Sequence, residues 1–297
     1  MRKIFWASDS TVQTNKFMTY PQTGIGQVFS LYTKDDVTVV NYAKNGRSTK
    51  SFIDEGRLQR IDEEIGAGDF LFIQFGHNDE KSQDPARYTE PFSTFMENLE
   101  IFINVARKHG AYPVLITPLE RRCFVDDKHL GIGAHSDYVA AMKQTAEKCN
   151  VPLADLYSMS RTELKKAGEM GSRKWFMYFS KGEYKNYPDG KTDNTHLRYD
   201  GAVLFAGLIA KGLQEAGGVY ADLRDYLSDD ILEKYKDSIL YISDENSSEK
   251  YPCGISLSSD NCTLLQKTNL YDSCILSICH TDSDKKLVKS FCKYILL

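Results

Sequence analysis

Short apolar runs alternate along this chain with longer segments in which apolar residues recur every three or four positions. The first run is Ile4-Phe5-Trp6-Ala7, and comparable runs follow at residues 36–42, 69–75, 112–117 and 151–156. Apolar runs of this length, bounded by turn residues, are typical of strands that are buried on both faces. We therefore predict five strands.

The segments between these runs predict helices. The clearest lies at residues 91–109, where apolar side chains fall at helical spacing and Gly110 provides an end. Similar patterns predict helices at residues 136–149 and 199–216 and a short one at 28–32, whereas residues 172–198 are an aromatic and polar stretch. Strands that alternate with helices form a parallel sheet with helices on both faces. The predicted fold is a three-layer α/β/α sandwich around a central, mostly parallel five-stranded sheet.

The character of the chain changes near residue 228. Polar and charged residues dominate as far as Lys250, and five of the 7 cysteines lie beyond it. We predict a compact domain at residues 1–227 and a partly ordered C-terminal appendage, of unknown role, at residues 228–297. The few cysteines of the main body form no disulfide framework, which is consistent with a reducing compartment. The spacing of cysteine and histidine in the tail does not match usual zinc sites, so no metal or other cofactor is expected.

Composition narrows the classes of function. The chain has 297 residues, of which 41% are apolar, which is enough for a sizeable core. A formal net charge of -4 disfavours a nucleic-acid groove, and no apolar run is long enough to span a membrane. Met1-Arg2-Lys3 leads directly into the first strand without a signal peptide, so a complete sequence would predict a cytoplasmic protein, whereas a trimmed one would not. The sequence favours no oligomeric state.

Polar turns follow the first three strands. Ser10 comes after the first, Gly46 after the second and Asn78 after the third. Because parallel strands end at the same edge of a sheet, these three turns are expected to lie close together. Ligands bind at this edge in open α/β sheets, which makes Ser10 a candidate nucleophile. Ser48 or Thr49 is a candidate cap for a helix that follows the second turn.

The residue types fit ester hydrolysis by a serine. That chemistry needs a hydroxyl, a base, a group that orients the base, and donors for the oxyanion. Ser10 offers the hydroxyl, and one short loop offers His196 as the base and Asp193 as its orienter. The oxyanion donors would be the backbone N–H groups of Ser10 and Gly46 and the side-chain amide of Asn78.

Each of these residues also has a plainer interpretation. Ser10 could only cap a turn, Asp193 could be only a turn residue, and Asn78 could only hold its own loop. Gly46 could be present only for its backbone angles, and His196 could be a surface residue. Asp9 is expected to fix the turn by accepting backbone N–H groups, and His77 to be structural. The other histidines with no partner pattern, expected at the surface or at caps, are His109, His129 and His135.

Four short blocks in order resemble those of the SGNH (GDSL-like) hydrolases. They are Ser8-Asp9-Ser10, Asn45-Gly46-Arg47-Ser48, Gly76-His77-Asn78-Asp79 and Asp193-Asn194-Thr195-His196. The resemblance covers residues 1 to about 226. The stretch Tyr20-Pro21-Gln22-Thr23-Gly24-Ile25-Gly26-Gln27 and the turns at Gly46 and His196 look most like the bacterial rhamnogalacturonan acetylesterases. The first block departs from the family pattern, since Ser8 stands where the family usually has glycine.

The resemblance implies a flavodoxin-like three-layer fold and a Ser-His-Asp triad that works without metal. It further implies removal of acetyl groups from carbohydrate, such as pectin fragments, through an acetyl-enzyme on Ser10. An acetylated oligosaccharide would then be the partner of the site. Arg47 is a candidate for binding a galacturonate carboxylate, and Trp175 for stacking on a sugar ring. Solvation of Arg47 and packing of Trp175 are the alternatives.

Two other functions fit the same scaffold. One is a lipolytic esterase or acyl-thioesterase, which would need an apolar acyl channel. The other is a carbohydrate-binding relative with little turnover, which the departure at Ser8 and the unusual tail would fit. The length of the preferred acyl chain and the reactivity of the serine separate these alternatives from a sugar deacetylase.

Overall fold

The computed structural model describes residues 1–133 and 135–225, and it describes five strand segments further on. The chain divides into two units. The first comprises Met1–Phe29 and Asp36–Arg224, and the second comprises Ser30–Asp35 and Asp225–Leu297. The predicted domain boundary at residue 227 stays a prediction, because most of the predicted appendage lies outside the described residues.

The second unit contains two small sheets in its described segments. Strands β8 (Ile239–Asp244), β9 (Lys250–Ser256) and β11 (Cys274–Ser277) form an antiparallel sheet in the order β11-β8-β9. Strands β10 (Thr263–Leu264) and β12 (Cys279–His280) form an antiparallel pair.

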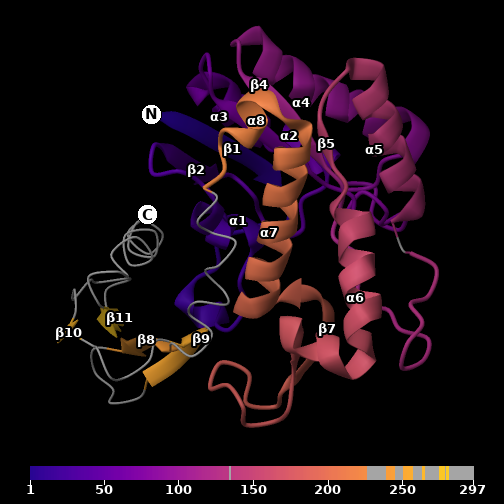
Figure 1. Ribbon diagram of the computed structural model, residues 1–297. Coiled ribbons are helices and arrows are strands. Elements are labelled where there is room, and N and C mark those ends of the chain that lie inside the picture. The colour runs from indigo at the N-terminus through magenta and orange to yellow at the C-terminus, as the bar shows by residue number, and fades with distance from the viewer. Residues whose placement is uncertain are drawn as a thin grey trace. The chain divides into compact units, whose positions relative to one another are not determined.

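The first unit is built on a parallel sheet of five strands, as predicted (Figure 1). The order is β2-β1-β3-β4-β5, and every neighbouring pair is parallel. This is the flavodoxin-like strand order. The central strand β3 is buried at all of its positions, as its apolar run predicts. The bounds are β1 Arg2–Ser8, β2 Val37–Asn41, β3 Phe70–Gln74, β4 Tyr112–Ile116 and β5 Leu153–Ala154.

Helices α2 to α5 cover one face of this sheet. Side chains that alternate along the strands, such as Phe5, Leu71 and Ile73, form one buried cluster with Phe52 and Phe102 from the helices. The alternation follows from the two-residue period of a strand, and it places the remaining strand residues on the other face. The bounds of these helices are α2 Thr49–Asp54, α3 Arg57–Glu64, α4 Met96–Lys108 and α5 Ser136–Cys149.

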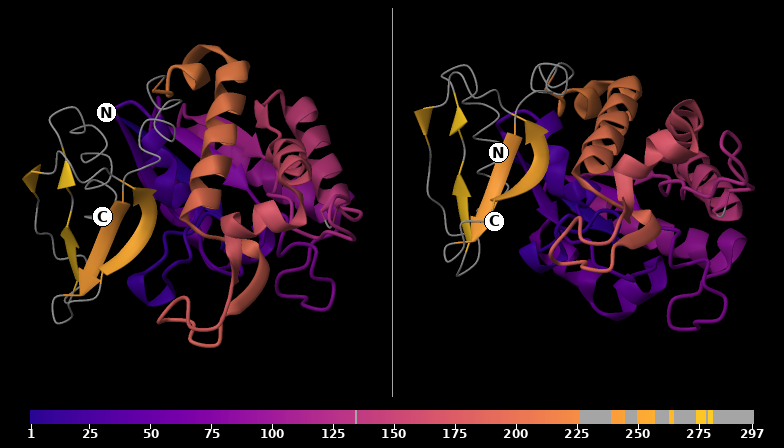
Figure 2. Two further views of the ribbon diagram at one scale, coloured as in Figure 1. Left: turned by 60° about the horizontal axis from the view of Figure 1, so that its bottom comes forward. Right: turned by 90° about the horizontal axis from the view of Figure 1, so that it is seen from below.

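The opposite face is covered by α1 (Ile25–Val28), α6 (Leu156–Ser172) and α7 (Tyr199–Ala216), with the short α8 (Gly218–Ala221) after α7. The ring of Trp6 on this face lies edge-on to Phe29 and Phe72, with centroids 5.0 and 5.2 Å away. Figure 2 shows α7 and α6 on one side of the sheet and helices of the N-terminal half on the other. The three-layer prediction is thereby confirmed.

Three of the expected segments differ from the observed elements. The helix expected at residues 91–109 begins with the wider π-helical segment η3 (Pro91–Phe95) before α4. The short helix expected at 28–32 is divided into α1 and the 3-10 turn η2 (Phe29–Tyr32). The aromatic stretch contains an antiparallel pair, β6 (Phe176–Phe179) and β7 (Lys191–Leu197). The remaining short helical turns are η1 (Phe17–Thr19) and η4 (Arg173–Trp175).

Helix α6 was not predicted at all. Its fully buried positions are Leu156, Ser160, Leu164 and Ser172, so half of its inward face is serine rather than apolar. In addition, Gly168 leaves helical geometry inside it, with φ at 73°. A helix with so little apolar periodicity and an internal break gives a weak sequence signal.

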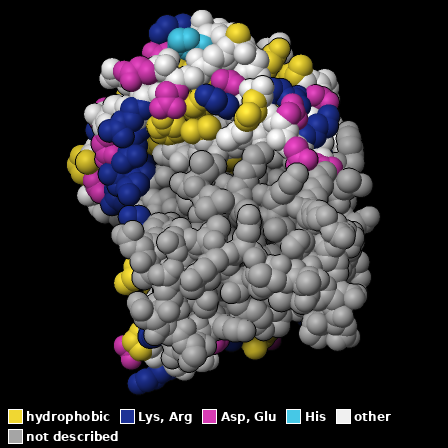
Figure 3. All heavy atoms as spheres, turned by 90° about the vertical axis from the view of Figure 1, so that its left-hand side faces the viewer, with side chains coloured by type: hydrophobic (Ala, Val, Ile, Leu, Met, Phe, Trp, Pro, Cys, Tyr) yellow, Lys and Arg dark blue, Asp and Glu magenta, His cyan; other side chains and the backbone are white. Residues whose placement is uncertain are grey.

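The surface carries mixed charge on the face that Figure 3 shows. On the coloured part of that face, Lys and Arg side chains lie beside Asp and Glu, with apolar side chains between them. Within the described residues, no helix combines the length and the apolar character that a bilayer crossing requires.

Candidate active site

A serine, a histidine and an aspartate form a hydrogen-bonded chain beyond the carboxyl end of β1. Oγ of Ser10 lies 2.9 Å from Nε2 of His196, although the two residues are 186 positions apart. Nδ1 of His196 in turn lies 2.8 Å from Oδ2 of Asp193. The three side chains that the sequence pattern singles out for ester chemistry are therefore in direct contact.

The direction of each hydrogen bond follows from the carboxylate. An ionised carboxylate only accepts, so Nδ1 of His196 carries the proton that it donates to Asp193. The other nitrogen of a neutral imidazole is then an acceptor, and the Ser10 hydroxyl donates to it. Burial raises the pKa of Asp193, but the hydrogen bond and charge of His196 and the backbone N–H groups of His196 and Thr195 together hold that pKa well below its usual value. The histidine is thus held in the tautomer that can take a proton from serine.

Asp193 and His196 lie in strand β7, and the expectation of a short loop was wrong. In a regular strand, residues three positions apart point to opposite faces. The pairing of β7 with β6 is irregular at this point: Phe176 pairs with Leu197, but Tyr178, only two residues further on, pairs with Thr192. The extra residues of β7 therefore form a bulge.

The side chain of Asp193 stabilises the bulge. Oδ1 of Asp193 accepts the backbone N–H of Thr195 at 2.9 Å and of His196 at 3.0 Å. This local turn brings the imidazole of His196 back over the other carboxylate oxygen. A strand that is interrupted in this way explains how an aspartate and a histidine at this spacing come to face each other.

A buried arginine that sequence reasoning missed anchors the same bulge. Nη1 of Arg122 donates to Oδ1 of Asn194 at 2.6 Å, and its backbone N–H donates to the Asn194 carbonyl at 2.9 Å. The guanidinium also forms an ion pair with Glu169 and donates to Oγ of Ser172 at 3.0 Å. No local pattern marks Arg122, because its partners come from other elements of the chain.

Three candidate oxyanion donors surround the end of the sheet. Among the described residues, the backbone N–H groups of Ser10 and Gly46 donate to no protein acceptor. Gly46 has φ at 76°, a conformation that glycine adopts without strain. The amide of Asn78 donates one of its two protons to the carbonyl of Arg47 at 3.0 Å. Its second proton is left for another acceptor.

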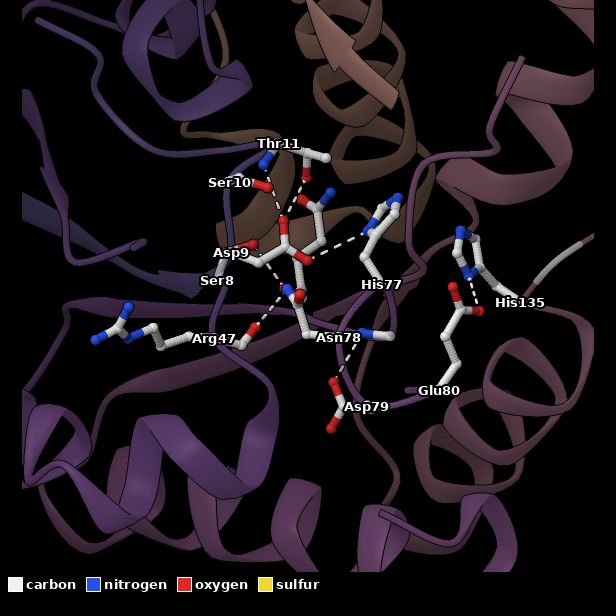
Figure 4. Close-up of polar contacts among 12 residues, drawn as sticks. Ser8, Asp9, Ser10, Thr11, Arg47, His77, Asn78, Asp79, Glu80 and His135 are labelled. Carbon is white, nitrogen blue, oxygen red and sulfur yellow. Dashed lines mark hydrogen bonds and ion pairs between the residues drawn. The ribbon is translucent and has the colours of Figure 1, made fainter. Parts of the chain in front are cut away.

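The side chain of Asp9 stabilises the turn that contains Ser10. Oδ1 of Asp9 accepts the backbone N–H of Thr11 at 2.9 Å and its hydroxyl at 2.8 Å, as expected for a turn residue. Nδ1 of His77 lies 3.2 Å from the other oxygen, and both side chains are almost fully buried. Figure 4 shows Asp9 between Thr11 and His77. Burial raises the pKa of Asp9, but His77 and Thr11 lower it by more.

His135 departs in part from the surface or capping role expected of it. It stands at the N-terminal cap position of α5, but its side chain makes no capping hydrogen bond. Its ring is fully buried, stacks edge-on against His77 at 4.4 Å and bonds to Glu80 at 2.7 Å (Figure 4). Burial and the neighbouring His77 lower the pKa of His135 to about 4, so it is neutral at pH 7.

The serine that replaces the usual glycine of the first block fits its place. Ser8 is fully buried, and its hydroxyl donates to the carbonyl of Gln74 at 2.6 Å. Ser8 and Gln74 are register partners at the ends of β1 and β3. The extra hydroxyl therefore joins the two strands that carry the Ser10 and Asn78 turns.

The comparisons with known proteins identify a family for this chain. Residues 9–209 match the family model of the GDSL-like lipases and acylhydrolases. The chain belongs to this family. It is therefore a carboxylic ester hydrolase of the GDSL-like type.

Two curated relatives of this GDSL-like chain come from Bacillus subtilis (strain 168). The rhamnogalacturonan acetylesterase RhgT is 41% identical over 227 residues, which cover 76% of this chain and 94% of the relative. The probable rhamnogalacturonan acetylesterase YesY is 42% identical over 214 residues, which cover 72% and 93%. The crystal structure of the B. subtilis protein YxiM is similar at a TM-score of 0.61 and 25% identity, over 73% of this chain and 57% of that one.

The two candidate substrate-binding residues of this GDSL-like chain make other contacts. The guanidinium of Arg47 pairs with Glu55, at 2.9 Å and 2.8 Å, and extends away from Ser10 in Figure 4. The indole of Trp175 packs edge-on against Phe205 of α7, with centroids 6.0 Å apart. These contacts favour structural roles, while substrate binding by Arg47 and Trp175 stays a prediction.

Proposed function

We propose that the chain is a serine esterase that removes O-acetyl groups from carbohydrate, with acetylated rhamnogalacturonan fragments from pectin as its substrate. The observation that carries the proposal is the hydrogen bond between Ser10 and His196, which is backed by Asp193. A hydroxyl that donates to an oriented imidazole is the arrangement of an activated serine nucleophile. The names of the two similar B. subtilis proteins support the choice of substrate.

In the proposed reaction, Oγ of Ser10 attacks the acetyl carbonyl while Nε2 of His196 takes its proton. The negative charge that develops on the carbonyl oxygen is met by the N–H groups of Ser10 and Gly46 and the amide of Asn78. His196 then gives the proton to the departing sugar oxygen, which leaves the acetyl group on Ser10. A water molecule, activated by the same imidazole, releases acetate and restores the serine.

Asp193 acts throughout as an orienter and not as a proton carrier. Its lowered pKa keeps it ionised while His196 gains and loses its proton. The positive imidazolium that forms during attack therefore has a fixed negative partner at 2.8 Å.

The test is acetate release from acetylated rhamnogalacturonan compared with acetylated xylan, together with a series of p-nitrophenyl esters from acetyl to octanoyl. We expect faster release from rhamnogalacturonan, and a kcat/KM that falls steeply beyond acetyl. Rates that rise with chain length would replace the proposal by a lipolytic esterase or acyl-thioesterase. Ser10→Ala is the matched control, since any acetate released by that variant does not come from this site.

A further inference from the structure

Arg87 lies close to two of the candidate oxyanion donors, Asn78 and Gly46. It belongs to a loop outside the four sequence blocks that resemble the SGNH hydrolases. Its Nη1 donates to Oδ1 of Asn78 at 3.3 Å. The same nitrogen is 3.7 Å from the point where a side chain at Gly46 would begin. One guanidinium nitrogen is therefore close to both Asn78 and Gly46.

The rest of the guanidinium is fixed by Asp84. Nε and Nη2 of Arg87 lie 2.6 and 2.5 Å from Oδ2 of Asp84. A guanidinium is rigid and planar, so anchoring one edge determines where the remaining nitrogen points. That nitrogen is Nη1, which points at Asn78. Hydrogen bonding to Arg87 also lowers the pKa of Asp84, so the two side chains stay oppositely charged.

Hydrogen bonds on both sides of Arg87 fix the loop that carries it. Oγ1 of Thr89 donates to the buried carboxyl of Asp79, and the hydroxyl of Tyr138 donates to the Thr89 carbonyl at 2.5 Å. Nζ of Lys50 donates to the Pro85 carbonyl at 2.6 Å. Arg87 therefore projects from a tethered segment.

The amide of Asn78 is oriented by the contacts at its two ends. Its oxygen accepts from Arg87, and its nitrogen donates to the Arg47 carbonyl. The Arg47 carbonyl selects the amide nitrogen at its end, because a flipped amide would place its oxygen against that carbonyl. Arg87 fixes the oxygen end, so the second N–H of Asn78 is held in one direction and is left for an oxyanion.

We propose that Arg87 is a positioning residue that acts through Asn78, holding and polarising the amide that donates to the oxyanion. The inference rests on the proposed function, because it assumes that Asn78 stabilises negative charge in the transition state. The contact between Arg87 and Asn78 is the same in the free enzyme and in the enzyme with bound substrate, so its loss should leave KM nearly unchanged. The Asn78 amide meets a full negative charge only in the transition state, so the loss of its polarisation and orientation should lower kcat.

The experiment is a double-mutant cycle on p-nitrophenyl acetate hydrolysis by the full chain. Removal of an oxyanion donor costs roughly 10²–10³ in kcat, so we expect Asn78→Ala to fall in that range. Arg87→Met, which keeps the length of the stem, should lower kcat by about tenfold and change KM by less than about threefold. In the Asn78→Ala background, the same Arg87→Met change should alter kcat by less than about twofold.

Arg60→Met is the matched control. It makes the same chemical change at an exposed position of α3, outside the Arg87 loop and its tethers, and its kcat should stay within about twofold of the wild type. Urea unfolding of every variant identifies any loss that comes from unfolding.

The outcomes separate this inference from the proposed function. An undiminished kcat in Asn78→Ala refutes the oxyanion role itself. If Asn78→Ala is slow, three results overturn the role of Arg87 alone. These are equal losses from Arg87→Met in both backgrounds, no loss in the wild-type background, or a raised KM at unchanged kcat.

Discussion

At the scale of single residues, the hydrogen bonds around His196 decide what the site can do. Asp193 accepts on both oxygens, from the imidazole and from two backbone N–H groups. It is therefore committed to one position and one charge state. Because Nδ1 of His196 donates to Asp193, Nε2 is left as an acceptor for the hydroxyl of Ser10.

Asp193→Asn tests that statement. An amide can present N–H to Nδ1 and so favour the wrong tautomer, and we expect kcat to fall by roughly 10³–10⁴ with little change in structure. The measurement is kcat for p-nitrophenyl acetate, with circular dichroism to compare the folds. Asp189→Asn makes the same chemical change in the same hairpin at an exposed position, and it should leave kcat unchanged. Comparable activity in the two variants would contradict the orienting role.

Some site residues could be predicted from the sequence and others could not. The two groups differ in how far along the chain their partners lie. Ser10, Gly46 and Asn78 follow strand ends, and Asp193 and His196 are close in the chain, so order and spacing suffice to suggest them. Arg122 and His135, by contrast, are defined by contacts with Asn194, 72 positions away, and with Glu80, 55 positions away. No local periodicity encodes such pairs.

At the scale of elements, the site depends on how α7 meets the segment before β6. Gly201, near the start of α7, lies so close to η4 that an added Cβ would be 2.1 Å from the Trp175 carbonyl oxygen. That oxygen also accepts the N–H of Arg198 at 3.0 Å. The close approach fixes the chain that runs from the His196 bulge into the helix.

Gly201→Ala is therefore expected to destabilise the fold by about 1–3 kcal/mol, because backbone must move to admit the methyl group. Gly171→Ala is the matched control, since its Cβ would meet only Ala167 at 3.6 Å on an exposed part of α6. It should be neutral or stabilising by up to about 1 kcal/mol. Urea unfolding measures both, and equal effects of the two substitutions would show that the approach at Gly201 is unimportant.

Element prediction succeeded where apolar residues follow a regular pattern. Apolar runs predicted all five strands of the sheet, and the helical period predicted α4, α5 and α7, whose apolar side chains are buried in the core. It failed at α6, whose inward face is half serine, and at β6 and β7, where a bulge interrupts the alternation of a strand. The irregular β7 carries Asp193 and His196, so function and local irregularity coincide.

At the scale of the whole molecule, all the candidate groups lie in the first unit. Ser10, Gly46, Asn78, Asp193 and His196 fall within Met1–Phe29 and Asp36–Arg224. The family match also ends at residue 209. The chemistry is therefore expected to depend on this unit.

A chain that ends at residue 227 tests this expectation and the predicted domain boundary together. We expect its kcat for p-nitrophenyl acetate to stay within about threefold of that of the full chain, since every group of the proposed reaction is retained. Circular dichroism establishes whether the shortened chain is folded. A folded but inactive shortened chain would mean that the C-terminal segment contributes to catalysis.

The most direct test of the account is covalent labelling of the full chain by a fluorophosphonate, mapped by peptide mass spectrometry. Only an activated serine reacts readily with this reagent. The account predicts one phosphonyl group per chain, on Ser10, and a much slower reaction in His196→Ala. Labelling at another serine, or labelling of Ser10 at the same rate without His196, would contradict it.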